Sequence, residues 1–188
     1  ACDIWNMTSI VRVNKNDQGL IYRTLDRGAQ GIVVPHVDTR EEAENLVQGG
    51  KFAPLGKRGL YTSRQGFGVP DYLSTANDET LLIALIEDIK AWENLDDILE
   101  VEGISVFFVA PSDFAASMGH IGNVAHPEVQ AKIDDALTRI VKAGRIAGAL
   151  AMTPNVRRYA EMGVQFFFTL PMPWIAIGAQ KFMEEAKV

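Results

Sequence analysis

Four polar side chains lie in or beside short apolar runs whose composition does not account for them. They are Arg12 in SIVRV, His36 after GIVVP, Glu87 after LLIALI and Asp113 in VAPSDF. A charged group in apolar surroundings is costly unless it is paired or binds a metal ion. Glu87 and Asp113 follow successive runs and, with substrate oxygens and water, would form the hard oxygen site that suits Mg²⁺ or Mn²⁺. Zinc is less suited, because the sequence contains no cluster of histidines and cysteines.

Each of these residues also has a structural explanation. Glu87 suits a helix start, near the positive end of the helix dipole. Asp113 suits an N-cap region, where Ser112 competes for the capping role. Arg12 could form a structural ion pair, and His36 could be a hydrogen-bonded loop residue. Only the agreement of several residues on one rim of a sheet favours a function.

The apolar runs predict strands that position these residues. The six runs are Ser9–Val13, Gly31–Val34, Leu81–Ile86, Ile104–Val109, Ile146–Leu150 and Val164–Thr169. They are continuously apolar, as in strands buried on both faces of a parallel sheet. Between and after them the pattern predicts helices at Gln18–Arg27, Arg40–Gln48, Lys90–Leu99, Pro127–Ala143, Pro154–Met162 and Trp174–Glu185.

The helix ends carry capping signals. Asn16 or Asp17 caps the first helix, and Thr39 with Glu42 forms a capping box, in which each satisfies the other's backbone N–H. His120 and His126 are interpreted as structural, because one lies in a Gly/Asn-rich loop and the other precedes the helix-opening Pro127.

Six βα units in succession predict a parallel sheet, either doubly wound or a (β/α)₈ barrel. A complete barrel takes about 250 residues, and this chain has 188. We therefore expect one domain, residues 1–188, that is an N-terminally incomplete TIM barrel lacking its first two βα units. Residues 1–7 would then be the tail of the helix that precedes the third barrel strand.

Composition excludes several classes of protein. The net charge is −6, which argues against nucleic acid as a partner, because binding to phosphates needs a basic surface. Cys2 is the single cysteine, so a disulfide framework is excluded. No apolar run approaches the roughly 20 residues that span a bilayer, so no membrane association is expected. These features predict a cytoplasmic protein.

An ordered set of motifs covers most of the chain and resembles the HpcH/HpaI aldolase family. The motifs are VRVNKND, GAQGIVVPHVDTREEAENLV, KFAPLGKRG, VPDYLSTAND, IALIED, VEGISVFFVAPSDFAASMGHIGN and HPEVQAKI. The family comprises 4-hydroxy-2-oxo-heptane-1,7-dioate aldolases and 2-dehydro-3-deoxyglucarate aldolases. Several bacterial members carry Met or another apolar residue at the position of His36. A histidine there is similar to the macrophomate-synthase-like branch of the family.

The resemblance implies a carbon–carbon lyase of the class II aldolase type. Such an enzyme forms and cleaves the bond between a keto acid, pyruvate or oxaloacetate, and an aldehyde through a metal-bound enolate. Glu87 and Asp113 would ligate Mg²⁺ or Mn²⁺, and Arg12 would hold the pyruvyl oxygen. Backbone N–H groups of Ser112 and Asp113 would hold the pyruvate carboxylate, with His36 also at the substrate. The family typically forms homo-hexamers in which dimers exchange C-terminal helices.

Two departures from the family pattern qualify these expectations. Leu85 replaces the glutamine that usually stands two residues before the metal-binding glutamate, so one polar contact to substrate is expected to be lost. The family's catalytic histidine and its neighbouring acid lie in a DxEHG-like motif, which this sequence does not contain. The catalytic base is therefore expected in a preceding N-terminal part.

Two other functions remain open at this point. A citrate-lyase-β or malyl-CoA-lyase-like enzyme would act on CoA thioesters, for which Lys57, Arg58 and Arg64 offer positive charge. A non-catalytic barrel would bind a keto acid or a partner chain. The joint presence of Arg12 with two carboxylates argues against that last alternative, because an unused metal site would leave costly unpaired charges.

Overall fold

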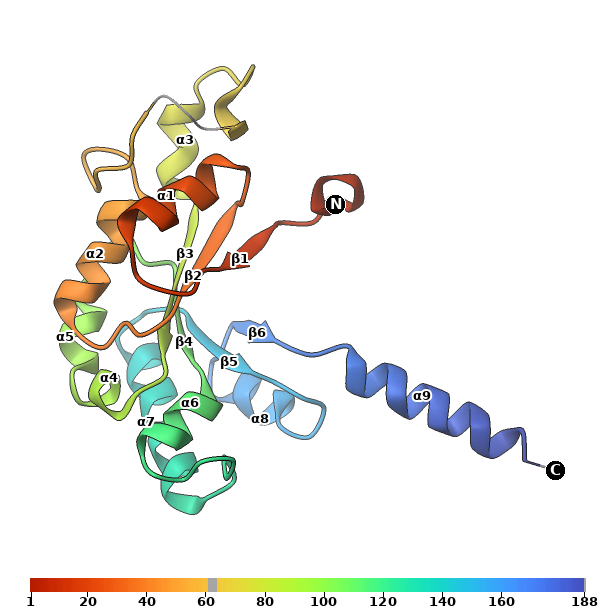
Figure 1. The fold of residues 1–188 in the computed structure, drawn as a ribbon. Coiled ribbons are helices and arrows are strands. Elements are labelled where there is room, and N and C mark those ends of the chain that lie inside the picture. The colour runs from red at the N-terminus through yellow and green to blue at the C-terminus, as the bar shows by residue number, and fades with distance from the viewer. Residues whose placement is uncertain (61–63, 188) are drawn as a thin grey trace.

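The computed structural model describes residues 1–60 and 64–187. Six strands form one parallel sheet in sequence order, curled into a half-barrel (Figure 1). They are β1 (Ile10–Arg12), β2 (Gly31–Val34), β3 (Leu81–Ile86), β4 (Val106–Val109), β5 (Ala147–Leu150) and β6 (Phe166–Phe168). All six lie inside the predicted apolar runs. Within the described residues β1 and β6 each pair with a single neighbour, so a closed (β/α)₈ barrel stays a prediction.

Helices follow the strands in the expected alternation. They are α1 (Gln18–Asp26), α2 (Arg40–Gly50), α3 (Tyr72–Glu79), α4 (Ile89–Glu93), α5 (Leu95–Leu99), α6 (Pro111–Ser117), α7 (Pro127–Lys142), α8 (Val156–Glu161) and α9 (Met172–Glu185), with 3₁₀ helices η1 (Cys2–Trp5) and η2 (Arg64–Gly66). The helical tail expected at residues 1–7 is thus a short 3₁₀ turn. Among the described residues no helix is both long and apolar enough to cross a membrane.

Three details of the helices differ from the sequence prediction. The single helix expected after β3 is two, α4 and α5, which meet at Asn94, whose side chain donates a hydrogen bond to the Asp38 carbonyl (2.9 Å). Neither α3 nor α6 was expected. The sequence of α3 is rich in residues that favour turns over helix interiors, and α6 begins at Pro111, directly after β4.

The predicted caps are partly right. The Asp17 carboxylate accepts a hydrogen bond from the Leu20 N–H (2.8 Å) and caps α1. At α2, Thr39 Oγ1 accepts from the Glu42 N–H (3.2 Å), as a capping box requires. The Glu42 carboxylate, however, accepts from the Asp38 N–H (2.8 Å), one residue before the expected Thr39, so the reciprocal half of the box was wrong.

The sheet carries two apolar layers because its side chains alternate between faces. The large layer lies between the sheet and its covering helices and includes Ile32, Phe107 and Leu137. The small layer lies on the concave face and consists of Ile83, Leu85, Val106 and Phe108. Leu85 thus adds to an apolar inner surface, where the family pattern would place a glutamine.

Lys51 is a buried cation at the end of α2. It is 4% exposed, and its ammonium donates hydrogen bonds to the carbonyl oxygens of Asn77 and, at 2.6 Å, Thr80. Burial lowers the pKa of Lys51 from 10.5 to about 8, because removal from water disfavours the charged form.

This shift predicts a dependence of stability on pH. Between about pH 8 and pH 10.5 the unfolded chain binds a proton that the folded chain does not, so the Lys51 contribution stabilises the fold as pH rises. The gain is at most about 3 kcal/mol. We expect urea unfolding between pH 7.5 and 10 to show the wild type gaining stability relative to a Lys51→Met control. A constant difference between the two proteins would contradict the shift.

Candidate active site

The carboxylate of Glu87 is the centre of the candidate site. Glu87 directly follows β3, and its side chain is 1% exposed. Its Oε1 accepts a hydrogen bond from the His36 backbone N–H at 3.0 Å, and the His36 Nδ1 lies 3.7 Å from the same oxygen. Its Oε2 lies 3.9 Å from Nη2 of Arg12. The structure therefore brings together three of the predicted site residues.

Strand order explains why residues so far apart in sequence meet. β1, β2 and β3 are neighbours with parallel registers, Arg12 pairing with Val33 and Val34 with Ala84. The C-terminal ends of parallel strands meet at one rim, where sites form in α/β folds. Arg12 ends β1, and its side chain is 57% exposed, so the guanidinium borders solvent as well as the buried carboxylate.

His36 has a left-handed backbone conformation, with φ 52°. This region is uncommon for a residue with a side chain and costs energy that surrounding contacts must offset. The turn after Pro35 directs the His36 N–H to Glu87, while the imidazole remains 66% exposed. His36 therefore fixes the carboxylate through its backbone and leaves its ring at the solvent side of the rim.

Asp113 and Ser112 lie in the first turn of α6, which begins after β4, and both are exposed. No side-chain cap closes this helix, and the first N–H groups of a helix lack intrahelical partners. The negative charge of Asp113 acts on Glu87 across the rim and raises the pKa of Glu87. The structure thus places Ser112 and Asp113 at the start of the helix that follows β4, the strand next to β3, and no hydrogen bond joins either of them to Glu87.

Burial raises the pKa of Glu87 above its ordinary value, because the charged form loses hydration. The hydrogen bond from His36 and the charges of His36 and Arg12 lower the pKa again, whereas the nearby Asp113 carboxylate raises it. The folded protein therefore holds a buried carboxylate whose negative charge is incompletely compensated.

This electrostatic arrangement fits a divalent cation. Two carboxylates whose charges repel each other are the ligands that Mg²⁺ or Mn²⁺ uses, and Mg²⁺ commonly takes only one or two protein carboxylates. A cation between Glu87 and Asp113 would remove both the repulsion and the cost of burying the Glu87 charge. The residues present therefore fit the expected metal ion.

Sequence reasoning missed Asp38, two residues beyond His36. Its Oδ1 is buried and has no hydrogen-bond partner among the described residues. Burial raises the pKa of Asp38, and the carboxylates of Glu42 and Asp88 raise it further, while His36 and Lys90 lower it. Its place in the short loop after β2, two residues beyond His36, is the signal in the sequence that could have identified it.

Comparisons with known proteins agree over most of the chain. Residues 3–168 match the family described as HpcH/HpaI aldolase/citrate lyase. A hydroxypyruvate/pyruvate aldolase of Pseudomonas aeruginosa is 41% identical over 162 residues, which cover 84% of this chain and 60% of that protein. A 4-hydroxy-2-oxo-heptane-1,7-dioate aldolase of Klebsiella pneumoniae is also 41% identical, over 84% of this chain and 61% of its own length. The chain thus spans about 60% of these relatives.

Solved structures show the same arrangement of elements. An HpcH/HpaI aldolase/citrate lyase family protein from Burkholderia cenocepacia superposes with a TM-score of 0.88 at 29% identity, covering 97% of this chain and 74% of that one. Macrophomate synthase superposes with a TM-score of 0.76 at 25% identity, covering 98% and 67%. A citrate lyase β subunit from M. tuberculosis, complexed with oxaloacetate and magnesium, shares the fold at 16% identity and a TM-score of 0.57, covering 86% and 66%.

Proposed function

Because this chain belongs to the HpcH/HpaI aldolase/citrate lyase family, we propose that the protein is a divalent-metal-dependent class II pyruvate aldolase. It forms and cleaves the carbon–carbon bond of 4-hydroxy-2-oxo acids, with pyruvate and an aldehyde as the two components. The observation that supports this most strongly is the buried Glu87 carboxylate between Arg12 and His36 at the sheet rim. Relatives named as aldolases support the same reaction class.

The proposed roles follow from the charge that the reaction develops. Cleavage develops negative charge on the keto oxygen of pyruvate, and Glu87 and Asp113 would hold a Mg²⁺ or Mn²⁺ ion that would supply Lewis-acid stabilisation of that charge. Arg12 donates hydrogen bonds from an always-charged guanidinium to that oxygen. The N–H groups of Ser112 and Asp113 hold the pyruvate carboxylate at the start of α6. His36 contacts the substrate with its exposed ring.

We also propose that the whole protein is a closed (β/α)₈ barrel. The half-barrel has a concave apolar face, and its edge strands β1 and β6 each have one neighbour among the described residues. Two further βα units between those edges would close the sheet, cover that face and satisfy the edge N–H and C=O groups.

The CoA-thioester alternative loses part of its support. Arg58 was one of three cations offered for a nucleotide, but its side chain is 0% exposed and its Nη2 lies 2.9 Å from the Asp26 carboxylate. A buried, paired guanidinium is unavailable to a phosphate. A non-catalytic barrel would need another reason to keep the uncompensated Glu87 charge, because an unused buried charge destabilises a fold.

We also propose that the protein is a homo-oligomer. α9 projects away from the sheet, and none of its residues is buried (Figure 1). Its exposed apolar side chains include Trp174, Ile177 and Phe182, more than an isolated surface helix should present to water. We expect light scattering to give the mass of a homo-oligomer, such as a hexamer. A monomeric mass would contradict this expectation.

The aldolase proposal is tested before any aldehyde is known. The protein, in its natural full length, is stripped of metal, and the exchange of pyruvate methyl protons in D₂O is followed by ¹H NMR. We expect exchange only after Mg²⁺ or Mn²⁺ is restored, since exchange reports the enolate directly. A folded protein that shows no exchange with either ion would overturn the proposal, and binding of CoA esters would then distinguish the two alternatives.

A further inference from the structure

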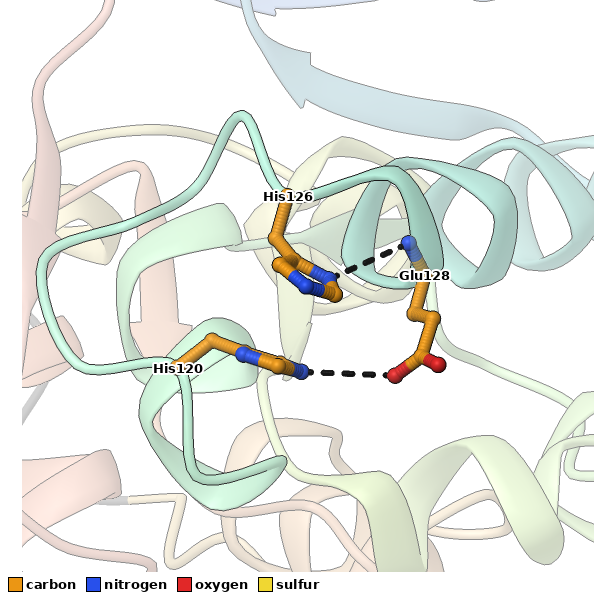
Figure 2. Close-up of side chains that lie close together, drawn as sticks. All are labelled: His120, His126 and Glu128. Atoms are coloured by element: carbon orange, nitrogen blue, oxygen red, sulfur yellow. Dashed lines mark hydrogen bonds and ion pairs between the residues drawn. The ribbon is translucent and has the colours of Figure 1, made fainter.

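A second cluster of metal-binding side chains lies outside the candidate active site. Figure 2 shows His120 and His126, from the loop between α6 and α7, together with Glu128 in the first turn of α7. One ligand atom from each of the three residues lies within 4.8 Å of the other two. Nε2 of His120 is 3.4 Å from Oε2 of Glu128. The sequence placed the histidines in a loop and at a helix start but did not indicate this convergence.

The backbone of the loop is held in place by its own hydrogen bonds. The His120 N–H donates to the Ala115 carbonyl at 2.8 Å, so the loop continues directly from α6. The Asn123 N–H donates to the His120 carbonyl at 2.9 Å, and the His126 N–H donates to the Asn123 carbonyl at 3.1 Å. The backbone at each histidine is therefore held in place, and rotation of the side chains would be enough to bring their ligand atoms to one metal ion.

Two glycines permit this compact loop. Gly119 has φ 83° and Gly122 has φ 74°, values that L side chains rarely adopt. These reversals turn the chain so that residues 120 and 126 face each other. The two imidazole rings stack with centroids 3.7 Å apart and planes 18° from parallel.

We propose that His120, His126 and Glu128 form a binding site for Zn²⁺, separate from the aldolase site. Two imidazole nitrogens and one carboxylate oxygen are a known three-residue ligand set for zinc, with water at the fourth position. Zinc–ligand bonds of about 2.0–2.1 Å place tetrahedral ligands roughly 3.3 Å apart. The 3.4 Å separation of His120 from Glu128 already matches that edge.

Binding requires one local rearrangement. Nδ1 of His126 accepts a 3.3 Å hydrogen bond from the Glu128 N–H, and the two imidazole rings stack nearly parallel. One ring must turn about its Cβ–Cγ bond so that both lone pairs meet at one ion. Glu128 follows easily, because its side chain is 73% exposed.

Two electrostatic effects at the start of α7 act on a bound cation in opposite directions. The start of α7 carries the positive end of the helix dipole, which disfavours a cation. The Glu128 carboxylate offsets this effect, and imidazole ligands select Zn²⁺ over Mg²⁺, which prefers oxygen. The site should therefore discriminate between the two ions, whereas the pair Glu87 and Asp113 offers oxygen ligands only.

The chain allows the two sites to be separated experimentally. It contains three histidines, and the remaining one, His36, lies beside Glu87. A Glu87→Gln background removes a ligand of the oxygen site while leaving the proposed zinc site intact. Zn²⁺ alone is titrated calorimetrically into the metal-free full chain in this background, and Co²⁺ is added as a visible-absorption probe of ligand number and type.

We expect one equivalent of Zn²⁺ per chain in the Glu87→Gln protein, retained in excess Mg²⁺, and Co²⁺ absorption typical of a low-coordinate nitrogen-containing site. Adding His126→Asn should remove both signals, and asparagine is a good N-cap, so α7 keeps its cap. Adding His36→Asn is the matched control and should retain both. If His126→Asn fails to fold by circular dichroism, Glu128→Gln decides in its place and should also lose the site.

Absence of Zn²⁺ binding in the Glu87→Gln protein would overturn this inference without affecting the aldolase proposal. Binding that survives both His126→Asn and Glu128→Gln would overturn it equally. Loss of binding in the His36→Asn control would place the ion at the strand rim, and would likewise refute a site at the start of α7.

Discussion

Replacing Glu87 with glutamine is expected to lower the rate of metal-dependent exchange of pyruvate methyl protons by roughly 10³-fold or more. Glutamine keeps the shape of the side chain and can still accept the His36 N–H bond that Glu87 accepts at 3.0 Å. It removes the negative charge that would hold the cation, so the Lewis acid is lost while the packing is retained. Exchange is measured by ¹H NMR with Mg²⁺ or Mn²⁺ at saturating pyruvate.

Stability gives this prediction a second readout. Burial raises the pKa of Glu87, so its charged form destabilises the metal-free fold at neutral pH, and that cost disappears as pH falls through the raised pKa. Metal-free Glu87→Gln should therefore melt at or above the wild-type temperature. The rise in melting temperature that Mn²⁺ gives the wild type should be much smaller in the variant.

The matched control for Glu87→Gln is Glu41→Gln. Glu41 is exposed in the first turn of α2. No hydrogen bond or ion pair joins it to Arg12, His36, Glu87 or Asp113, so Glu41→Gln should retain both exchange and the response to Mn²⁺. Near-normal exchange in a folded Glu87→Gln protein would remove Glu87 from the metal site and, with it, the main support for the proposed chemistry.

Replacing Arg12 with lysine is expected to lower the exchange rate by about 10²–10³-fold, the usual loss when one donor to a developing oxyanion is removed. The guanidinium of Arg12 lies 3.9 Å from Glu87, beyond hydrogen-bonding distance, and its side chain is 57% exposed. Its donors can therefore turn to a substrate oxygen beside the carboxylate. Lysine keeps the charge but cannot present the planar pair of N–H groups.

The measurement separates catalysis from metal binding. Mn²⁺ should still raise the melting temperature of Arg12→Lys, because both proposed carboxylate ligands remain. Arg157→Lys is the matched control, since Arg157 is 90% exposed on α8 and pairs with Glu161. An Arg12→Lys protein as active as this control would show that Arg12 serves only as an ion-pair partner of Glu87.

Much of the fold was predictable from local sequence. Continuous apolar runs marked all six strands, and Asp17 and Pro127 marked the starts of two helices. These signals are local, because strand burial and capping depend on a few consecutive residues. The division of one expected helix at Asn94 was not local, since it accompanies a hydrogen bond to Asp38, 56 positions away.

Arg12, His36 and Glu87, which lie together in the structure, could be named from the sequence, but their geometry could not. A charged residue at the end of an apolar run identified Glu87, and Arg12 was unusual within its strand. The sequence did not indicate that Glu87 is buried while Asp113 is exposed. It also did not indicate that Arg58 is buried in an ion pair with Asp26. Each of these outcomes depends on partners that lie many residues apart.

The order of the six strands, the family resemblance and Arg12, His36 and Glu87 at the rim could all be inferred from the sequence. Which of those residues contact one another depends on the folded chain, because the hydrogen bond from His36 to Glu87 joins positions 51 apart through the register of neighbouring strands. The convergence of His120, His126 and Glu128 also depends on the folded chain. Two glycine turns and the start of α7 set that convergence, and no periodicity in a sequence records the direction in which a side chain finally points.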